Sequence, residues 1–312
     1  MIVLNIEPAN FSKNAISYLA KNGFLYFESK VPSNNNVEAI IVRLENYVGH
    51  EFISHYPNLK YIISPTTGTD HIDLELIERK NIKLISLKNE TRYLNKITAT
   101  AELNWGLLIS LARNFNQAFK SVFEGNWDRN LFIGEQLSKK KLGIVGLGRL
   151  GKIIANYGTA FNMKILYYDP YVDLKKFKKC KTLVELVQNS DYISINVPLN
   201  KETENLFDAL ILNKIKKGAK IINTSRGKIL NEEELTIRLK NGLIGGYATD
   251  VLSNEVNFSM TKKISDNKLF ELSKVNKNII ITPHIGGATS DSMIMAENFV
   301  IRKFINTFKN AE

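Results

Sequence analysis

Cysteine is nearly absent from this chain. A single cysteine, Cys180, occurs among 312 residues, so no internal disulfide framework can form and disulfide-rich secreted scaffolds are excluded. No apolar stretch approaches the roughly 18–20 residues that cross a bilayer. The apolar run near the N-terminus is too short for a signal peptide. We therefore expect a cytoplasmic protein that does not enter a membrane.

Arginine is also scarce. Of the 42 basic residues behind the formal charge of +11, nine are arginine and 33 are lysine. Nucleic-acid recognition relies on arginine forks with aromatic partners, whereas these lysines are scattered, with local runs at 139–141 and 175–181 that suit solvated faces. No Cys/His/Asp cluster suggests a metal site. We expect neither a nucleic-acid partner nor a bound metal. The histidines are His50, His55, His71 and His284.

Apolar strands and helical patterns alternate along most of the sequence. Continuous apolar strands separated by helices predict a parallel sheet covered on both faces, as in a doubly wound α/β domain. The second half shows this rhythm clearly, and the first half repeats it more weakly, with helices between its strands and no glycine-rich turn. Strands are expected at residues 2–6, 25–29, 38–44, 59–64 and 82–86, and then at 141–148, 163–169, 191–198, 219–225, 244–251 and 278–285.

Two further segments set the domain boundaries. Residues 97–123 have the pattern of one long amphipathic helix that bridges two domains, and residues 290–310 predict a helix that returns to the first half. We therefore expect one domain at 1–97, completed by 286–312, and a second domain at 98–285.

A glycine-rich turn lies at the start of the second series of alternating strands and helices. In "GIVGLGRLG", Gly146, Gly148 and Gly151 have the G-x-G-x-x-G spacing directly after a strand and at a helix start. Such a turn brings backbone N–H groups and a helix N-terminus to a pyrophosphate. Asp169 ends the next strand, where a carboxylate can bind both ribose hydroxyls and repel a 2′-phosphate, which favours NAD over NADP. Arg149 either touches the pyrophosphate or is a surface residue.

Three polar residues follow strand ends. Arg226 follows "KIINTS", Glu255 lies in "ATDVLSNE", and His284 follows "IIITP". Each has a plain structural interpretation: a surface ion pair, a solvated loop carboxylate or a structural histidine. Ligands of open α/β sheets bind beyond the carboxyl ends of strands, so beside a dinucleotide turn the three form a candidate catalytic set.

The motifs together resemble one family. "GIVGLGRLG…YYDP", "INVPLNKET", "INTSRGKI", "GYATDVLSNE" and "TPHIGGAT", with the earlier "ISPTTGTDHIDL" and "TATAELNWGLLISLAR", are similar to the D-isomer-specific 2-hydroxyacid dehydrogenases, in order and over nearly the whole chain. The resemblance implies a Rossmann NAD-binding domain inserted in a flavodoxin-like substrate domain. It also implies a homodimer and an NAD-dependent interconversion of a D-2-hydroxy acid and its 2-oxo acid.

The resemblance also implies residue roles. Arg226 would hold the carboxylate and carbonyl of the 2-oxo acid, His284 would be the acid–base group, and Glu255 would hold the imidazole and keep it protonated. Asp250 would contact the nicotinamide carboxamide, and backbone N–H groups of Thr67 and Gly68 would bind the substrate carboxylate. The implied cofactor-binding set is Gly146, Gly148, Arg149, Leu150, Gly151, Asp169, Val197, Pro198, Thr203, Thr224 and Asp250.

Departures from the family pattern leave alternatives open. Val256 stands where the family usually has proline, and we expect a more mobile loop after it. Arg43 is followed by Leu44 and Glu45, whereas relatives acting on 3-phosphoglycerate often have an arginine pair there, so D-3-phosphoglycerate dehydrogenase activity is an alternative. The 28 residues after His284 suit a short form without a regulatory domain. Formate dehydrogenases of this type pair histidine with glutamine, which argues against that activity. An NAD-sensing, corepressor-like binding protein is the rival from another class.

Overall fold

The chain forms two compact units. The structure, a computed structural model, describes residues 1–31, 33–255 and 263–310. Unit 1 comprises Met1–Ile97 and Ala288–Glu312, and unit 2 comprises Thr98–Gly287. The first boundary falls at the predicted position, and the second falls two residues after it.

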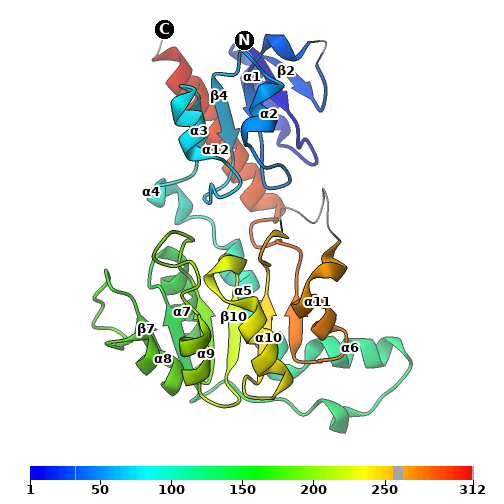
Figure 1. The fold of residues 1–312 in the computed structure, drawn as a ribbon, viewed down its shortest axis with the longest axis vertical. Coiled ribbons are helices and arrows are strands. Elements are labelled where there is room, and N and C mark those ends of the chain that lie inside the picture. Colours follow the sequence, from blue (N-terminus) through cyan, green and yellow to red (C-terminus); the bar gives the residue numbers. More distant parts are fainter. Residues whose placement is uncertain (32, 256–262, 311–312) are drawn as a thin grey trace. The chain divides into compact units, whose positions relative to one another are not determined.

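Unit 1 is built on a parallel sheet whose strands run in the order β2-β1-β3-β4-β5 (Figure 1). This is the flavodoxin-like order, in which the chain winds outward from a central strand in both directions. All five strands lie within two residues of their predicted positions at both ends, apart from β3, which ends three residues earlier than predicted, and the predicted fold class is confirmed. The strands are β1 (Ile2–Asn5), β2 (Leu25–Glu28), β3 (Val37–Ile41), β4 (Tyr61–Ser64) and β5 (Lys83–Ser86).

Helices cover both faces of this sheet. One apolar core joins the sheet to α1 and to the C-terminal α12, and a second joins its other face to α2 and α3. Between β2 and β3, where a helix is expected, only a 3-10 turn forms at Asn34–Asn36, because asparagine side chains compete for backbone hydrogen bonds. The helices are α1 (Lys13–Lys21), α2 (His50–Ser54), α3 (Leu74–Arg79), α4 (Thr91–Leu94) and α12 (Ser290–Lys309).

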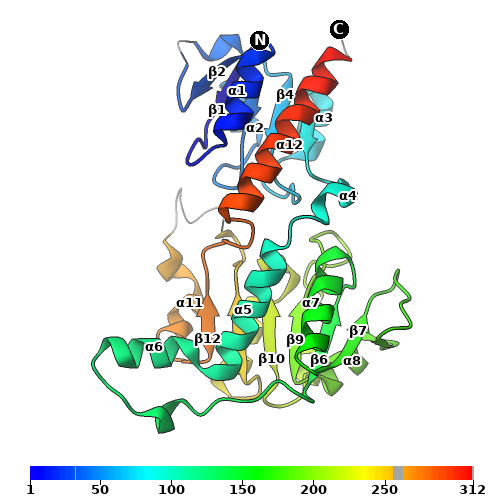
Figure 2. The same ribbon diagram turned by 180° about the vertical axis from the view of Figure 1, so that it is seen from behind.

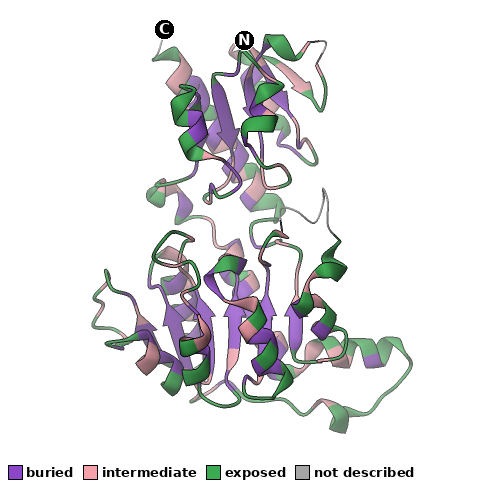
Figure 3. Ribbon diagram, viewed as in Figure 1, coloured by how far each residue is buried: buried purple, intermediate pink, exposed green. Residues whose placement is uncertain are grey.

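Unit 2 has a larger parallel sheet with the order β12-β11-β10-β9-β6-β7-β8. The order reverses between β6 and β9, which is the switch point of a Rossmann domain. Figure 3 shows that its strands are largely buried. The two-residue strand β8 is not predicted, since two exposed lysines carry no strand pattern. The strands are β6 (Lys141–Val145), β7 (Lys164–Tyr168), β8 (Lys178–Lys179), β9 (Tyr192–Ile195), β10 (Lys220–Asn223), β11 (Gly246–Thr249) and β12 (Ile279–Ile281).

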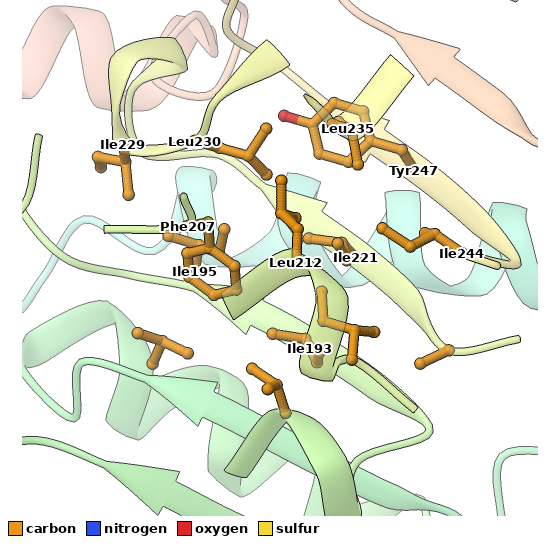
Figure 4. Packing of buried hydrophobic residues seen from close by; sticks show 14 of the residues in the cluster. Ile193, Ile195, Phe207, Leu212, Ile221, Ile229, Leu230, Leu235, Ile244 and Tyr247 are labelled. Carbon is orange, nitrogen blue, oxygen red and sulfur yellow. The ribbon is translucent and has the colours of Figure 1, made fainter. Parts of the chain in front are cut away.

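Two helical layers enclose this sheet. Helices α5 and α7 pack on one face (Figure 2), and α8, α9, α10 and α11 pack on the other. Figure 4 shows the second core, where Phe207 and Leu212 meet the sheet residues Ile193 and Ile221. The helices are α5 (Ala99–Arg113), α6 (Phe115–Phe123), α7 (Arg149–Ala160), α8 (Leu183–Asn189), α9 (Ala209–Lys214), α10 (Glu232–Lys240) and α11 (Lys268–Ser273).

The prediction of a single long helix over residues 97–123 is wrong. The helix breaks at Asn114, whose φ of 54° is left-handed, and α6 starts in a new direction. The cause is a tertiary contact: at Gly134 an added Cβ would lie 2.4 Å from the carbonyl oxygen of Ala112, and the Asn114 amide donates to the Ile133 carbonyl oxygen at 3.1 Å. The returning chain therefore packs on the end of α5.

Two further observations concern the described part of the chain. None of its helices combines the length and apolar character needed to cross a membrane, and no three His, Cys, Asp or Glu side chains gather there as a potential metal site. The loop expected after Glu255 begins at Val256, and residues 256–262 lie outside the described residues. From Ile264 onward the chain forms a 3-10 turn, Ile264–Asp266, and α11.

Candidate active site

The glycine turn between β6 and α7 leaves no room for a side chain at Gly146 and Gly151 but has open space at Gly148. At Gly146, where φ is 85°, an added Cβ would lie 2.7 Å from the Asn196 carbonyl oxygen, and at Gly151 it would lie 2.1 Å from the Gly146 carbonyl oxygen. At Gly148 it would meet nothing within 4 Å. Gly148 is also the N-cap of α7, with no side-chain cap. Backbone N–H groups at an uncapped helix start suit a pyrophosphate, so this turn fits a dinucleotide.

Asp169 ties this turn to the end of β7. The carboxylate is buried; one oxygen accepts from the Leu147 N–H at 2.8 Å, and the other accepts from Tyr171 and Val172 N–H at 2.8 and 3.0 Å. A carboxylate has about four acceptor positions, so capacity remains for a ribose hydroxyl. Its predicted ribose contact stays a prediction.

Arg149 and Leu150 form the first turn of α7 and are half-buried. This partial burial lowers the pKa of the Arg149 guanidinium. Their predicted contacts with the cofactor are untested.

The loop after β9 lies beside the glycine turn. Val197 approaches the Cβ position of Gly146 to 2.7 Å. Thr203 closes the loop: its hydroxyl donates to the Pro198 carbonyl oxygen at 2.5 Å and accepts from the Asn200 N–H at 2.9 Å. This loop is therefore held in shape by its own side chains, and the expected cofactor contacts of Val197, Pro198 and Thr203 stay predictions.

The three candidate catalytic residues follow three neighbouring strands. Arg226 follows β10, Glu255 follows β11 and His284 follows β12, and these strands pair in that order in one sheet. Nδ1 of His284 lies 2.7 Å from a carboxylate oxygen of Glu255. The other Glu255 oxygen accepts from the Leu252 N–H at 3.0 Å. About a quarter of each side chain is exposed, and Nε2 is the ring nitrogen of His284 that does not face Glu255.

His284 adopts a strained backbone conformation that Asp250 holds. Its φ is 53°, a left-handed value that is uncommon outside glycine and asparagine. Asp250 accepts from the N–H groups of Ile285 and Gly286 at 2.8 and 2.7 Å and from the Thr282 hydroxyl at 2.6 Å. Its own carbonyl oxygen accepts from the His284 N–H at 2.9 Å.

Asp250 therefore has a positioning role that the sequence does not reveal. The side chain is fully buried, and burial raises the pKa of Asp250 against the opposing effect of these hydrogen bonds. Its predicted contact with the nicotinamide carboxamide stays a prediction.

The loop that carries Arg226 packs on the loop that carries Glu255. An added Cβ at Gly227 would lie 2.2 Å from the Leu252 carbonyl carbon, so only glycine allows this approach. The buried Asn223 accepts from the Ser225 N–H and donates to the Arg226 carbonyl oxygen, both at 3.0 Å. The backbone of Arg226, whose guanidinium is half-buried, is thus held in place by both of these contacts.

Thr67 and Gly68 belong to unit 1, on the loop after β4. The Thr66 hydroxyl donates to the Gly68 carbonyl oxygen at 2.8 Å and contacts the Ser64 hydroxyl at 2.8 Å. The fully buried His71 contacts the same Ser64 hydroxyl at 3.3 Å. This loop is internally bonded, and its predicted grip on the substrate is untested.

Comparison with known proteins decides the family. Residues 105–286 match the family described as D-isomer specific 2-hydroxyacid dehydrogenase, NAD binding domain. The chain belongs to this family. Both the predicted resemblance and the prediction of NAD as cofactor are thereby confirmed, and the NAD-binding region is the one that carries the glycine turn and the His284–Glu255 pair.

Several dehydrogenases are similar over most of this chain. D-3-phosphoglycerate dehydrogenase of Archaeoglobus fulgidus is 33% identical over 316 residues, which cover 96% of this chain and 57% of that protein. Glyoxylate reductase of Thermococcus gammatolerans is 31% identical over 288 residues, which cover 89% and 81%. A D-lactate dehydrogenase of Aquifex aeolicus, solved with NAD and lactic acid, superimposes with a TM-score of 0.81 at 27% identity, covering 99% and 96%. This chain spans about half the length of the matched D-3-phosphoglycerate dehydrogenases.

Proposed function

We propose that this member of the family is an NAD-dependent oxidoreductase that interconverts a D-2-hydroxy acid and its 2-oxo acid. The observation that carries the proposal is the His284–Glu255 pair at 2.7 Å, which shares a sheet with the open glycine turn after β6 and is separated from it by β10 and β9. When bound, NAD would supply or accept the hydride at C2 of the acid. The protein must then deliver or remove one proton at the C2 oxygen.

His284 is suited to that proton transfer. Because Nδ1 faces Glu255, Nε2 is the nitrogen that gives a proton to the carbonyl oxygen in reduction and takes one from the hydroxyl in oxidation. The Glu255 carboxylate orients the ring through its contact with Nδ1. Arg226, a permanently charged planar fork, holds the substrate carboxylate and the carbonyl oxygen. Thr67 and Gly68 N–H groups are proposed as further donors to that carboxylate.

The surroundings of Arg43 favour a substrate without a phosphate group. Its guanidinium forms an ion pair with the buried Glu297, donates to the Ala9 carbonyl oxygen at 2.8 Å and lies over the Phe11 ring at 5.6 Å. Its positive charge is thus balanced within the protein by Glu297, which weakens its attraction for a phosphate. The proposed substrate is therefore a small unphosphorylated 2-oxo acid.

The assembly proposed is a homodimer formed through α6 and the segment after it. Phe119, Phe123, Trp127, Leu131 and Ile133 are all at least 66% exposed, which is unusual for side chains of this size clustered in sequence. A pocket between α5 and α7 is lined by Trp105, Tyr157 and Phe161 among others, and the buried indole N–H of Trp105 has no acceptor among the described residues. A second copy offers both an apolar arm and carbonyl acceptors.

We also propose a cytoplasmic location, consistent with the single free Cys180.

The decisive experiment is NADH oxidation with a panel of 2-oxo acids: glyoxylate, pyruvate, hydroxypyruvate and 3-phosphohydroxypyruvate. We expect turnover with at least one unphosphorylated acid. His284→Gln should lower kcat by about 10²- to 10⁴-fold while the Kd for NADH changes less than about twofold, because the ring acts on the substrate. Tight NADH binding with no turnover on any acid would instead favour a nucleotide-sensing binding protein. A parallel loss of turnover and NADH affinity in the variant would make His284 structural.

A further inference from the structure

A buried amide stands out in α5. Asn104 is fully buried on a helix face that otherwise contributes Ala101, Leu108 and Leu111 to the apolar core. A buried amide is unfavourable unless both of its ends are hydrogen-bonded. Asn104 meets this requirement, because its oxygen lies 3.0 Å from the Ser194 hydroxyl and its nitrogen lies 3.0 Å from the Thr224 hydroxyl.

The direction of these hydrogen bonds follows from one backbone carbonyl. The Asn196 amide lies 3.1 Å from the Ser194 carbonyl oxygen, which can only accept, so the atom facing it is the Asn196 nitrogen. The same nitrogen donates to the Ser194 hydroxyl at 3.0 Å. The buried Ser194 hydroxyl then directs its one proton to the Asn104 oxygen, and the Asn104 nitrogen must donate to Thr224.

These directions leave the Thr224 hydroxyl to act as a hydrogen-bond donor. Its hydroxyl oxygen accepts from Asn104, and no acceptor for its own proton lies among the residues that the structure describes. Thr224 directly follows β10 and precedes Arg226 by two residues, at the sheet edge where ligands of doubly wound domains bind. Asp169 marks the adenosine side of this edge and the His284–Glu255 pair marks the reacting side, so Thr224 lies toward the nicotinamide half.

We propose that Asn104 is a positioning residue that sets the Thr224 hydroxyl as a hydrogen-bond donor to the nicotinamide half of NAD, whose carboxamide oxygen is the acceptor. This inference rests on the proposed function. It assigns Thr224 a polar contact with the cofactor, and it accounts for a polar residue within the apolar face of α5.

The test compares binding of NADH with binding of ADP-ribose, which lacks the nicotinamide ring. Thr224→Val, isosteric without the hydroxyl, should raise the Kd for NADH about five- to tenfold, the range expected for one lost hydrogen bond. The Kd for ADP-ribose should change less than about twofold. Thr224→Ser, which keeps the hydroxyl, should restore NADH binding. Asn104→Leu should shift NADH binding in the same direction as Thr224→Val, with ADP-ribose unchanged.

Thr236→Val is the matched control, since Thr236 is equally buried in α10 and its hydroxyl donates to the Glu232 carbonyl oxygen at 2.6 Å. It should leave both dissociation constants unchanged. The inference is overturned if Thr224→Val weakens the binding of NADH and of ADP-ribose equally, or weakens neither. In that case turnover by the unaltered protein still supports the proposed function. If the unaltered protein neither binds NADH nor turns over any of the 2-oxo acids, the proposed function fails first. Should Asn104→Leu not fold, the valine–serine pair at Thr224 still decides.

Discussion

Some residues of this protein serve both the fold and the proposed active site. His284 is held at a φ of 53°, which for a residue other than glycine costs about 1–2 kcal/mol. Hydrogen bonds to Asp250 from Thr282 before it and from Ile285 and Gly286 after it offset that strain. Asp169 likewise combines a fold contact, through the Leu147 N–H, with a proposed ligand contact. Substitutions at such residues change stability and ligand binding together.

Asp169→Ala should show this dual effect. Removing the carboxylate leaves the Leu147, Tyr171 and Val172 N–H groups without their acceptor, so we expect the unfolding free energy to fall by about 1–3 kcal/mol. Without the negative charge a 2′-phosphate is no longer repelled, so the ratio of kcat/KM with NADH to kcat/KM with NADPH should fall. An undiminished preference for NADH would remove Asp169 from the ribose site.

Arg226→Lys separates charge from geometry. An ammonium keeps the positive charge but cannot bind a carboxylate and a carbonyl oxygen as a planar fork, so KM for the 2-oxo acid should rise on the order of tenfold or more. The Kd for NADH should be unchanged. Steady-state kinetics at saturating NADH measures the effect, and an unaltered KM would contradict the substrate role.

At the scale of elements, tertiary contacts decide where helices end. The apolar pattern of residues 97–123 continues through Asn114, yet the chain turns there because residues 133–134 dock on the end of α5. The same principle appears at the carboxyl end of the sheet, where Glu232 at the start of α10 accepts from the Ser253 N–H and from the Asn267 amide. One helix start thus holds the loop of Glu255 and the start of α11.

Substitution of Asn114 tests the helix break. Alanine favours a continuous helix but strains the left-handed conformation, so Asn114→Ala should lower the unfolding free energy by about 1–2 kcal/mol. Asn114→Gly loses the same amide hydrogen bond yet tolerates the positive φ, and it should be the more stable of the two in urea denaturation. A more stable alanine variant would indicate that α5 and α6 form one helix.

At the scale of the whole molecule, the chain builds unit 1 from both of its ends. Helix α12 packs on α1 in the same core as β3 and β4, and Glu297 of α12 is fully buried against Arg43 and the Ser12 N–H. Unit 2 has two cores of its own. Six exposed large apolar side chains follow one another on and after α6, from Phe119 to Ile133, and they are the basis of the proposed dimer.

Replacing Phe123 and Trp127 together by serine tests the dimer. Both side chains are more than 90% exposed, so the change should leave the fold of one copy intact while removing a large part of the apolar contact area. We expect the mass measured by light scattering to fall from two chains to one at micromolar concentration. Replacing Leu25 and Val275, which are also exposed, is the control. A monomeric unaltered protein would contradict the proposal.

Local pattern was sufficient for the sheets and for the cofactor turn. Buried parallel strands are continuous apolar runs, and Gly146, Gly148 and Gly151 follow one of them, the first and third at positions where the turn leaves no room for a Cβ. The pairing of Glu255 with His284 was predicted from the resemblance, and the structure brings these two side chains together. Their catalytic role, and that of Arg226, stays a prediction. The break at Asn114, the strand β8 and the hydrogen bonds of Asp250 and Asn104 were not predicted.

The amino-acid sequence by itself determined the order of strands and helices, the glycine turn and the residue types at the strand ends, because these depend on apolar periodicity and on backbone freedom within a few residues. Only the tertiary structure decided which polar atoms meet. Asn104 reaches Thr224 across 120 positions of the chain, and Asp250 reaches Gly286 across 36. Hydrogen bonds require partners at about 3 Å with the right direction, and that condition exists only once the chain has folded.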